Sequence, residues 1–163
     1  MNGERLRVGV ILQISGAESD RGEEMNAGIS RIMQKTNREG GIRGRKVEII
    51  VGNGMEDEAE TLLVAKKLLE MDYAHVVICE AGRWITSPVV RAAERGRTPL
   101  LLYGENAAYP GVKSDWVFKI PGSGKEGLEE LSGALKMAFV AMRKTGPDKV
   151  RIKKILEENL SAR

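Results

Sequence analysis

Short apolar runs alternate with longer amphipathic stretches along most of the chain, and this alternation constrains the fold more than any other feature. The apolar runs predict buried strands, at residues 5–12, 46–51, 75–79, 99–103 and 115–120. Apolar residues at helical spacing predict helices between them, at residues 20–40, 56–71 and 86–95. Strands that alternate with helices in this way form parallel sheets through right-handed crossovers. We therefore expect a three-layer α/β fold, with about five parallel strands and helices on both faces of the sheet.

The last forty or so residues depart from the alternation. Apolar residues at helical spacing run from Leu128 to Gly146, and a second amphipathic stretch begins after Pro147. Proline is well suited to the start of a helix, and glycine to its end. Two consecutive helices are expected here, without a strand between them.

The composition excludes several classes of protein. The chain has 163 residues, of which 42% are hydrophobic, 30% charged and 4% aromatic, which suits one globular domain and excludes a disordered or collagen-like chain. The net charge is +3, and the two signs are interspersed, so we expect no nucleic-acid site. No apolar run reaches the roughly 18 residues of a membrane helix, and the first residues do not resemble an export signal. The single cysteine cannot form an intrachain disulfide.

Residues that could carry enzymatic chemistry are few. His75 and Cys79 are the only histidine and cysteine, so no catalytic triad and no His- or Cys-rich metal site is expected. Asp57 and Glu58 fit the first turn of a helix better than a metal site. The segment 122–125, Gly-Ser-Gly-Lys, lacks the spacing of a phosphate-binding loop. We expect a protein that is not an enzyme and that has no cofactor and no metal.

A ligand site is most readily placed at the carboxyl ends of the strands, because open parallel sheets bind ligands there. Glu80, Arg83, Trp84, Glu105 and Asn106 follow the third and fourth predicted strands. One interpretation is a charged rim that faces water. The other is a site in which Trp84 forms an apolar wall, while Arg83 and helix amide groups hold a carboxylate.

The sequence resembles a known family at several motifs. These are the strand Val8–Leu12, then Ser15-Gly16, and above all the stretch from Asn37 to Glu48, which reads Asn-Arg-Glu-Gly-Gly-Ile-Arg-Gly-Arg-Lys-Val-Glu. They are similar to the opening of type I periplasmic binding proteins, and in particular to the leucine/isoleucine/valine-binding group. The resemblance implies one lobe with a flavodoxin-like strand order, taken from a protein in which two lobes trap a ligand for ABC-type uptake.

The resemblance also implies a division of the chain. Residues 1–120 would form the strand and helix units, and residues 126–163 would be the helices that return to the first lobe. Residues 121–125 would be a short bridge in place of a second lobe. The whole chain, residues 1–163, would then be a single lobe, whether it is natural or engineered.

Ligand contacts can be carried over by position, although this chain departs from the family there. The family has small hydroxyl residues in the loops after the third and fourth strands, and this chain has Gly-Arg-Trp and Gly-Glu-Asn. A plain branched-chain amino acid is therefore not the expected ligand. The predicted ligand-binding residues are Ser15, Gly82, Arg83, Trp84, Gly104, Glu105 and Asn106.

The leading hypothesis is a non-enzymatic lobe that binds a small amino-acid-like or carboxylate ligand weakly, with an ABC permease as partner. The resemblance implies a periplasmic or cell-surface location, as a mature form, an engineered piece or a cytoplasmic variant. A second hypothesis is an interaction module that forms a homodimer, in which a second copy covers Trp84, Tyr103 and Tyr109. A flavodoxin-like enzyme or cofactor binder, and an engineered lobe without function, are the remaining alternatives.

Overall fold

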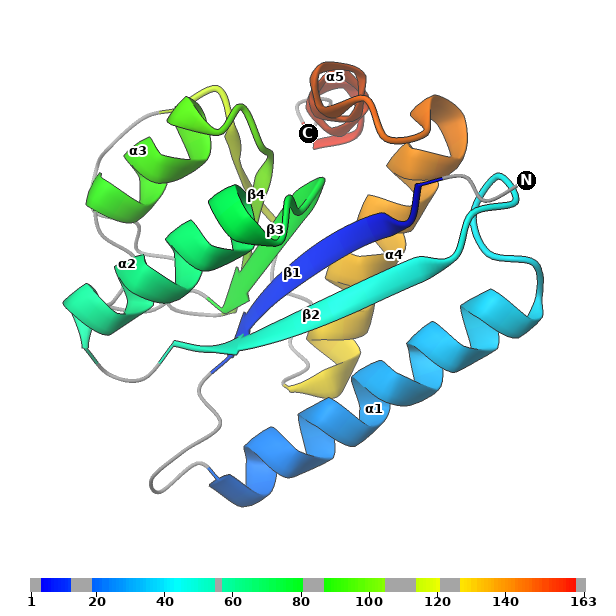
Figure 1. The fold of residues 1–163 in the computed structure, drawn as a ribbon, viewed down its shortest axis with the longest axis horizontal. Helices are drawn as coiled ribbons and strands as arrows, with labels where there is room; N and C mark the ends of the chain where they lie inside the picture. The colour runs from blue at the N-terminus through cyan, green and yellow to red at the C-terminus, as the bar shows by residue number, and fades with distance from the viewer. Residues whose placement is uncertain are drawn as a thin grey trace.

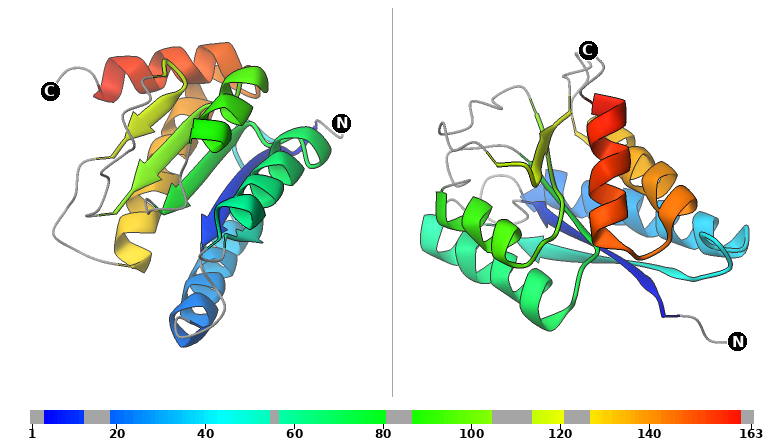
Figure 2. Two further views of the ribbon diagram at one scale, coloured as in Figure 1. Left: turned by 90° about the vertical axis from the view of Figure 1, so that its left-hand side faces the viewer. Right: turned by 90° about the horizontal axis from the view of Figure 1, so that it is seen from above.

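A parallel sheet lies at the centre of the molecule, with helices on both faces (Figures 1 and 2). The computed structural model describes residues 4–12, 19–54, 57–80, 87–104, 114–120 and 127–160. In this part of the chain the sheet has five strands in the order β2-β1-β3-β4-β5, and every pair is parallel. The strands are β1 (Leu6–Leu12), β2 (Val47–Asn53), β3 (Val76–Glu80), β4 (Leu100–Tyr103) and β5 (Val117–Lys119). The predicted α/β class and the flavodoxin-like strand order are confirmed.

The two faces of the sheet bury separate hydrophobic cores. Helices α1, α4 and α5 cover one face, and α2 and α3 cover the other (Figure 1). Side chains of β1 alternate between the cores, since Val8 and Val10 face the first and Ile11 faces the second. The helices are α1 (Ser19–Arg38), α2 (Glu58–Lys66), α3 (Ser87–Arg95), α4 (Leu128–Thr145) and α5 (Lys149–Leu160). None of the described helices is long and apolar enough to cross a membrane.

The helix predicted at residues 56–71 has two parts. Asp57 caps α2, because its carboxylate accepts hydrogen bonds from the backbone N–H groups of Ala59 and Glu60. The same helix continues as a π-helical turn, η2 (Lys67–Met71). The π-helical turn brings Lys67 within 2.7 Å of the Asp72 carboxylate five residues later. The prediction that Asp57 belongs to the start of a helix is therefore confirmed, with the more specific role of a cap.

The motif that carries the family resemblance builds the turn between α1 and β2. The Asn37 side chain pairs with both backbone polar groups of Val47, at 2.8 and 2.9 Å. Ile42 is fully buried in the core under α1 and α4. Gly41 has a φ of +74°, and a Cβ atom there would collide with the Arg45 carbonyl oxygen, so glycine is required. This motif stabilises the scaffold at the amino end of β2.

The last two helices pack back on the same sheet. Leu131, Leu135 and Phe139 of α4 lie in the core that β1 and β4 line, and α5 packs against α4 and β5. The Lys149 ammonium group donates hydrogen bonds to the Gly96 carbonyl oxygen at 2.8 Å and to the Thr98 hydroxyl at 3.1 Å. These contacts join the start of α5 to the segment between α3 and β4.

Candidate functional site

The carboxyl ends of β1 and β3 lie side by side at the centre of the sheet. From β1 the chain runs through α1 to β2 on one side, and from β3 it runs through α3 to β4 on the other side. In open parallel sheets this reversal leaves a crevice that commonly binds ligands. The candidate site is therefore built from the residues at these strand ends and from the start of α1.

An ion pair joins α1 to β3 at this point. Arg21, in the first turn of α1, donates to both carboxylate oxygens of Glu80, the last residue of β3. The Nη2–Oε1 distance is 2.7 Å and the Nη1–Oε2 distance is 3.2 Å. The two side chains are 33% and 23% exposed. A two-point contact of this kind fixes orientation as well as distance, so both charges are held in place at the edge of the site.

Tyr103 lies beside this pair, at the end of β4. It is opposite Glu80 in the strand register, and its side chain is 1% exposed in the core under α1 and α4. Burial, together with the negative charge of Glu80, raises the pKa of the Tyr103 hydroxyl above its usual value, so the phenol stays neutral. In the part of the chain that the structure describes, this hydroxyl has no hydrogen-bond partner.

The structure describes one of the seven predicted ligand contacts. Gly104 follows β4 directly and has a φ of +115°, a backbone conformation that favours glycine. The sequence predicts that Gly104 follows the fourth strand at the carboxyl edge of the sheet, and the structure has it there. The other six lie outside the described residues, and their role stays a prediction: Ser15, Gly82, Arg83, Trp84, Glu105 and Asn106.

The homodimer hypothesis is wrong in one respect. It assigned Tyr103 to a surface that a second copy could cover, but Tyr103 is buried within a single chain. The cause is the packing of α4 against β4, which makes Tyr103 part of the core on the α1 and α4 face. Trp84 and Tyr109, the other two residues of that hypothesis, lie outside the described residues.

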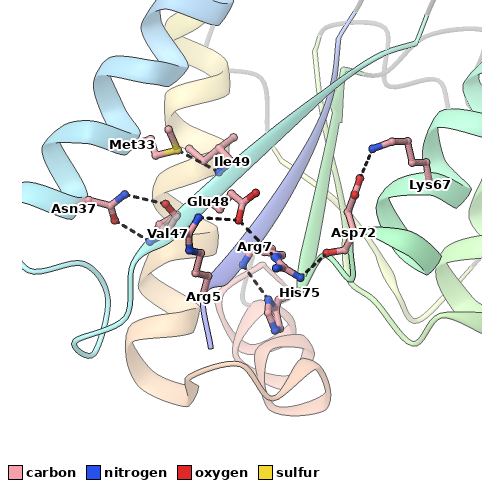
Figure 3. Close-up of polar contacts among 10 residues, drawn as sticks. All are labelled: Arg5, Arg7, Met33, Asn37, Val47, Glu48, Ile49, Lys67, Asp72 and His75. Carbon is pink, nitrogen blue, oxygen red and sulfur yellow. Dashed lines mark hydrogen bonds and ion pairs between the residues drawn. The ribbon is translucent and has the colours of Figure 1, made fainter. Parts of the chain in front are cut away.

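A second group of polar residues lies at the opposite, amino edge of the sheet (Figure 3). The backbone N–H of Arg7 donates to His75 Nδ1 at 3.0 Å, and the backbone N–H of His75 donates to the Arg7 carbonyl at 2.8 Å. The Arg7 guanidinium also donates to the Asp72 carbonyl, and it shares the Glu48 carboxylate with Arg5. Burial lowers the pKa of His75, so the ring is a neutral acceptor within the sheet.

Cys79 offers no reactive group. Its side chain is fully buried on the α2 and α3 face, and burial raises the pKa of the thiol well above its usual value. A buried protonated thiol is a poor nucleophile and a poor metal ligand. Among the described residues, no three His, Cys, Asp or Glu side chains are grouped so that they could hold a metal ion.

Two surface hollows lie away from the carboxyl edge. One, of about 600 Å³, lies between the end of α3 and the segment before β5 and is lined by Glu94, Arg95, Arg97, Ser114, Asp115 and Trp116. The other, of about 350 Å³, lies on α4 and α5 and is lined by Gly133, Lys136, Met137, Val140 and Asn159. Neither includes Arg21, Glu80 or Tyr103, so neither extends the candidate site.

The sequence pattern of periplasmic binding proteins matches residues 5–138. The chain belongs to this family. The match includes all five strands and most of α4, and it confirms the resemblance predicted from the sequence. No curated protein matches the chain.

Solved structures of periplasmic binding proteins share the fold. LivJ from Streptococcus pneumoniae, the substrate-binding protein of a branched-chain amino acid transporter in complex with isoleucine, is 20% identical over 71% of this chain, with a TM-score of 0.57. A substrate-binding periplasmic protein from Ralstonia solanacearum is 20% identical over 80% of this chain, with a TM-score of 0.61. A structure from Rhodospirillum rubrum covers 98% of this chain at 14% identity, with a TM-score of 0.59.

The match is to one part of each of these larger proteins. This chain covers 33% of LivJ, 37% of the Ralstonia protein and 47% of the Rhodospirillum protein. At these identities the likeness establishes the fold of the lobe, and the ligand contacts have to be argued from this chain's own residues.

Proposed function

We propose that this chain is the ligand-binding lobe of a substrate-binding component for ABC-type uptake. Its ligand would be a small amino-acid-like or carboxylate molecule at the carboxyl ends of the strands. The family match over residues 5–138 carries this proposal. The isoleucine complex of LivJ, a protein with the same fold, supports an amino-acid-like ligand.

The proposed contacts come from the loops that follow β1, β3 and β4. They are the seven predicted residues, Ser15, Gly82, Arg83, Trp84, Gly104, Glu105 and Asn106. Their loops leave the sheet at the edge where the Arg21–Glu80 ion pair and Gly104 lie, which supports a shared site. Arg83 would hold a ligand carboxylate, and Trp84 would cover the apolar part of the ligand.

The proposed role is binding without catalysis. The lobe would act with an ABC permease in an extracytoplasmic compartment, as the relatives' printed names imply for those proteins. Within the described residues, His75 lies at the amino edge and Cys79 is buried on the α2 and α3 face, so neither offers a reactive group to a ligand, which supports a site that holds its ligand unchanged.

We also propose that residues 1–163 act as a single lobe, with residues 121–125 as a bridge to the returning helices. The packing of α4 and α5 on the same sheet supports this division. A pocket normally encloses most of its ligand, whereas one lobe provides only one wall. Binding to the isolated chain should therefore be weak, with dissociation constants in the millimolar range.

Titration calorimetry with the twenty L-amino acids and a set of small carboxylic acids tests this function. Arg83→Ala should abolish the weak binding of whichever compound binds. Arg97→Ala is the matched control, because Arg97 is an exposed arginine at the amino edge. If no compound of the panel bound, the proposed function would be contradicted. A micromolar dissociation constant would contradict the argument that one lobe, as a single wall, binds its ligand weakly. Equal loss in both variants would contradict the assignment of Arg83.

A further inference from the structure

Strand β2 is an edge strand, and one of its two sides has no neighbouring strand in the described part of the sheet. The Leu6 N–H donates to the Lys46 carbonyl oxygen at the start of the pairing with β1, and the Gly54 N–H donates to Leu12 at its end. The even-numbered residues of β2 therefore direct their backbone polar groups to β1, and the odd-numbered residues direct theirs to the outer edge. Exposed edge groups of this kind pair readily with other chains unless they are covered.

Helix α1 supplies partners for this outer edge, as Figure 3 shows. Asn37 pairs with the N–H and the C=O of Val47, at 2.8 and 2.9 Å. One helical turn earlier, the Met33 sulfur accepts a hydrogen bond from the N–H of Ile49, with an N–S distance of 3.4 Å. Successive turns of α1 thus hold successive outward-facing residues of β2. The second of these contacts depends on a thioether sulfur, which is a weak acceptor.

The Met33 sulfur is also an atom that peroxides oxidise. Met33 is half-buried, whereas Met25 and Met142 are 2% and 0% exposed and Cys79 is fully buried. In the reaction with hydrogen peroxide the O–O bond breaks as an S–O bond forms. The sulfur loses two electrons and becomes a sulfoxide, and the peroxide is reduced, its second oxygen leaving as water with both protons. The product is polar and chiral, so it no longer fits an apolar contact.

We propose that Met33 is a site of reversible oxidation that controls how firmly α1 is held on the edge of β2. An oxygen added on the sulfur lone pair that faces Ile49 has no room between two atoms 3.4 Å apart, so α1 has to move away from the strand. An oxygen added on the other lone pair withdraws electrons from the sulfur and makes it a poorer acceptor. Both epimers therefore loosen the contact with the Ile49 N–H. Methionine sulfoxide reductases reverse the change, with one enzyme for each epimer.

Amide hydrogen exchange of the full chain, followed by NMR, tests this inference. Mass spectrometry of peptides measures the fraction of Met33 that hydrogen peroxide has oxidised. Oxidation should raise the exchange rate of the Ile49 amide about fivefold or more, because its hydrogen bond is lost. The Ile50 amide faces β1 and should change by less than about twofold. Reduction by the two reductases should restore the original rate at Ile49.

Two variants identify the methionine that is responsible. Met33→Leu keeps an apolar side chain without the sulfur, so Ile49 should exchange faster before any treatment, and peroxide should cause no further rise. Met71→Leu is the matched control, because Met71 is 71% exposed, and it should keep the full response to peroxide.

Four results would overturn the proposal. The first is complete oxidation of Met33 with an unchanged exchange rate at Ile49. The second is an equal rise at Ile49 and Ile50, because oxidation would then destabilise the whole sheet. The third is a rise with peroxide in Met33→Leu, and the fourth is a Met33 that stays unoxidised after Met71 has reacted completely.

Discussion

The ion pair between Arg21 and Glu80 should contribute measurably to stability. An exposed pair contributes from 0 to about 1 kcal/mol, because water screens it and two long side chains lose freedom. Here the contact has two points, at 2.7 and 3.2 Å, and the side chains are only 33% and 23% exposed. Charge-assisted hydrogen bonds of this kind contribute about 1.5–3 kcal/mol where water is largely excluded. Partial exposure places the expected coupling between these ranges, at about 1–1.5 kcal/mol.

A double-mutant cycle measures that coupling directly. The free energy of unfolding in urea is determined for the unmodified chain, Arg21→Gln, Glu80→Gln and the double variant. The cycle cancels the other interactions of each side chain, provided that the two changes create no new contact. Arg21→Lys keeps the charge but lacks the planar fork, and should retain less than half of the coupling.

The pair between Lys67 and Asp72 is the matched control cycle. Its N–O distance is also 2.7 Å, but it is a single-point contact in which Lys67 is 58% exposed. Its coupling should be below about 0.5 kcal/mol. If the Arg21–Glu80 cycle gave a value as small as this, two-point geometry and partial burial would not strengthen the pair, and the description of a fixed charge pair at the site would be refuted.

Three further predictions concern the scaffold. Gly41→Ala should lower the free energy of unfolding by more than about 2 kcal/mol, and Gly44→Ala by about 1 kcal/mol. Both glycines have a positive φ, but only the Cβ atom of an alanine at position 41 would collide with backbone atoms. Equal losses in denaturant titrations would contradict this. As pH falls below about 6.5, the unfolded chain should protonate before buried His75, so stability should fall by up to about 1.4 kcal/mol per pH unit. His75→Asn should flatten this part of the stability–pH curve, and an unchanged slope would contradict the assignment of this pH dependence to His75. Cys79 should react with a thiol reagent only as fast as the chain opens, so rapid labelling in native buffer would contradict its burial.

The strands could be predicted from the sequence because a buried strand shows as a short run of apolar residues. β1 is covered on both faces, so its apolar residues run continuously, and the same is true of β3 and β4. The π-helical turn could not be predicted in this way. Over five residues, the apolar spacing of an α-helix and of a π-helix differ by less than one position, so Leu68 and Leu69 fit both.

The candidate site was only partly predictable. Glu80 could be placed at the carboxyl edge, because it directly follows an apolar run. Its partner Arg21 is 59 residues away, and pairing the two requires knowing that the first turn of α1 lies beside the end of β3. Tyr103 was predicted to lie on an exposed rim, because strand ends are usually open, and the sequence gives no local sign that α4 covers it.

The residues that identify the family and the residues that would select a ligand lie at opposite edges of the sheet. Asn37, Gly41 and Ile42 hold the turn before β2 at the amino edge, and their requirements are purely conformational. Arg21 and Glu80 lie at the carboxyl edge, where a change of side chain alters charge but leaves the backbone path intact. A lobe of this kind can therefore keep its family signature while its ligand changes. For this reason the choice of ligand has to be argued from the residues at the carboxyl edge, because the turn motif before β2 determines backbone conformation only.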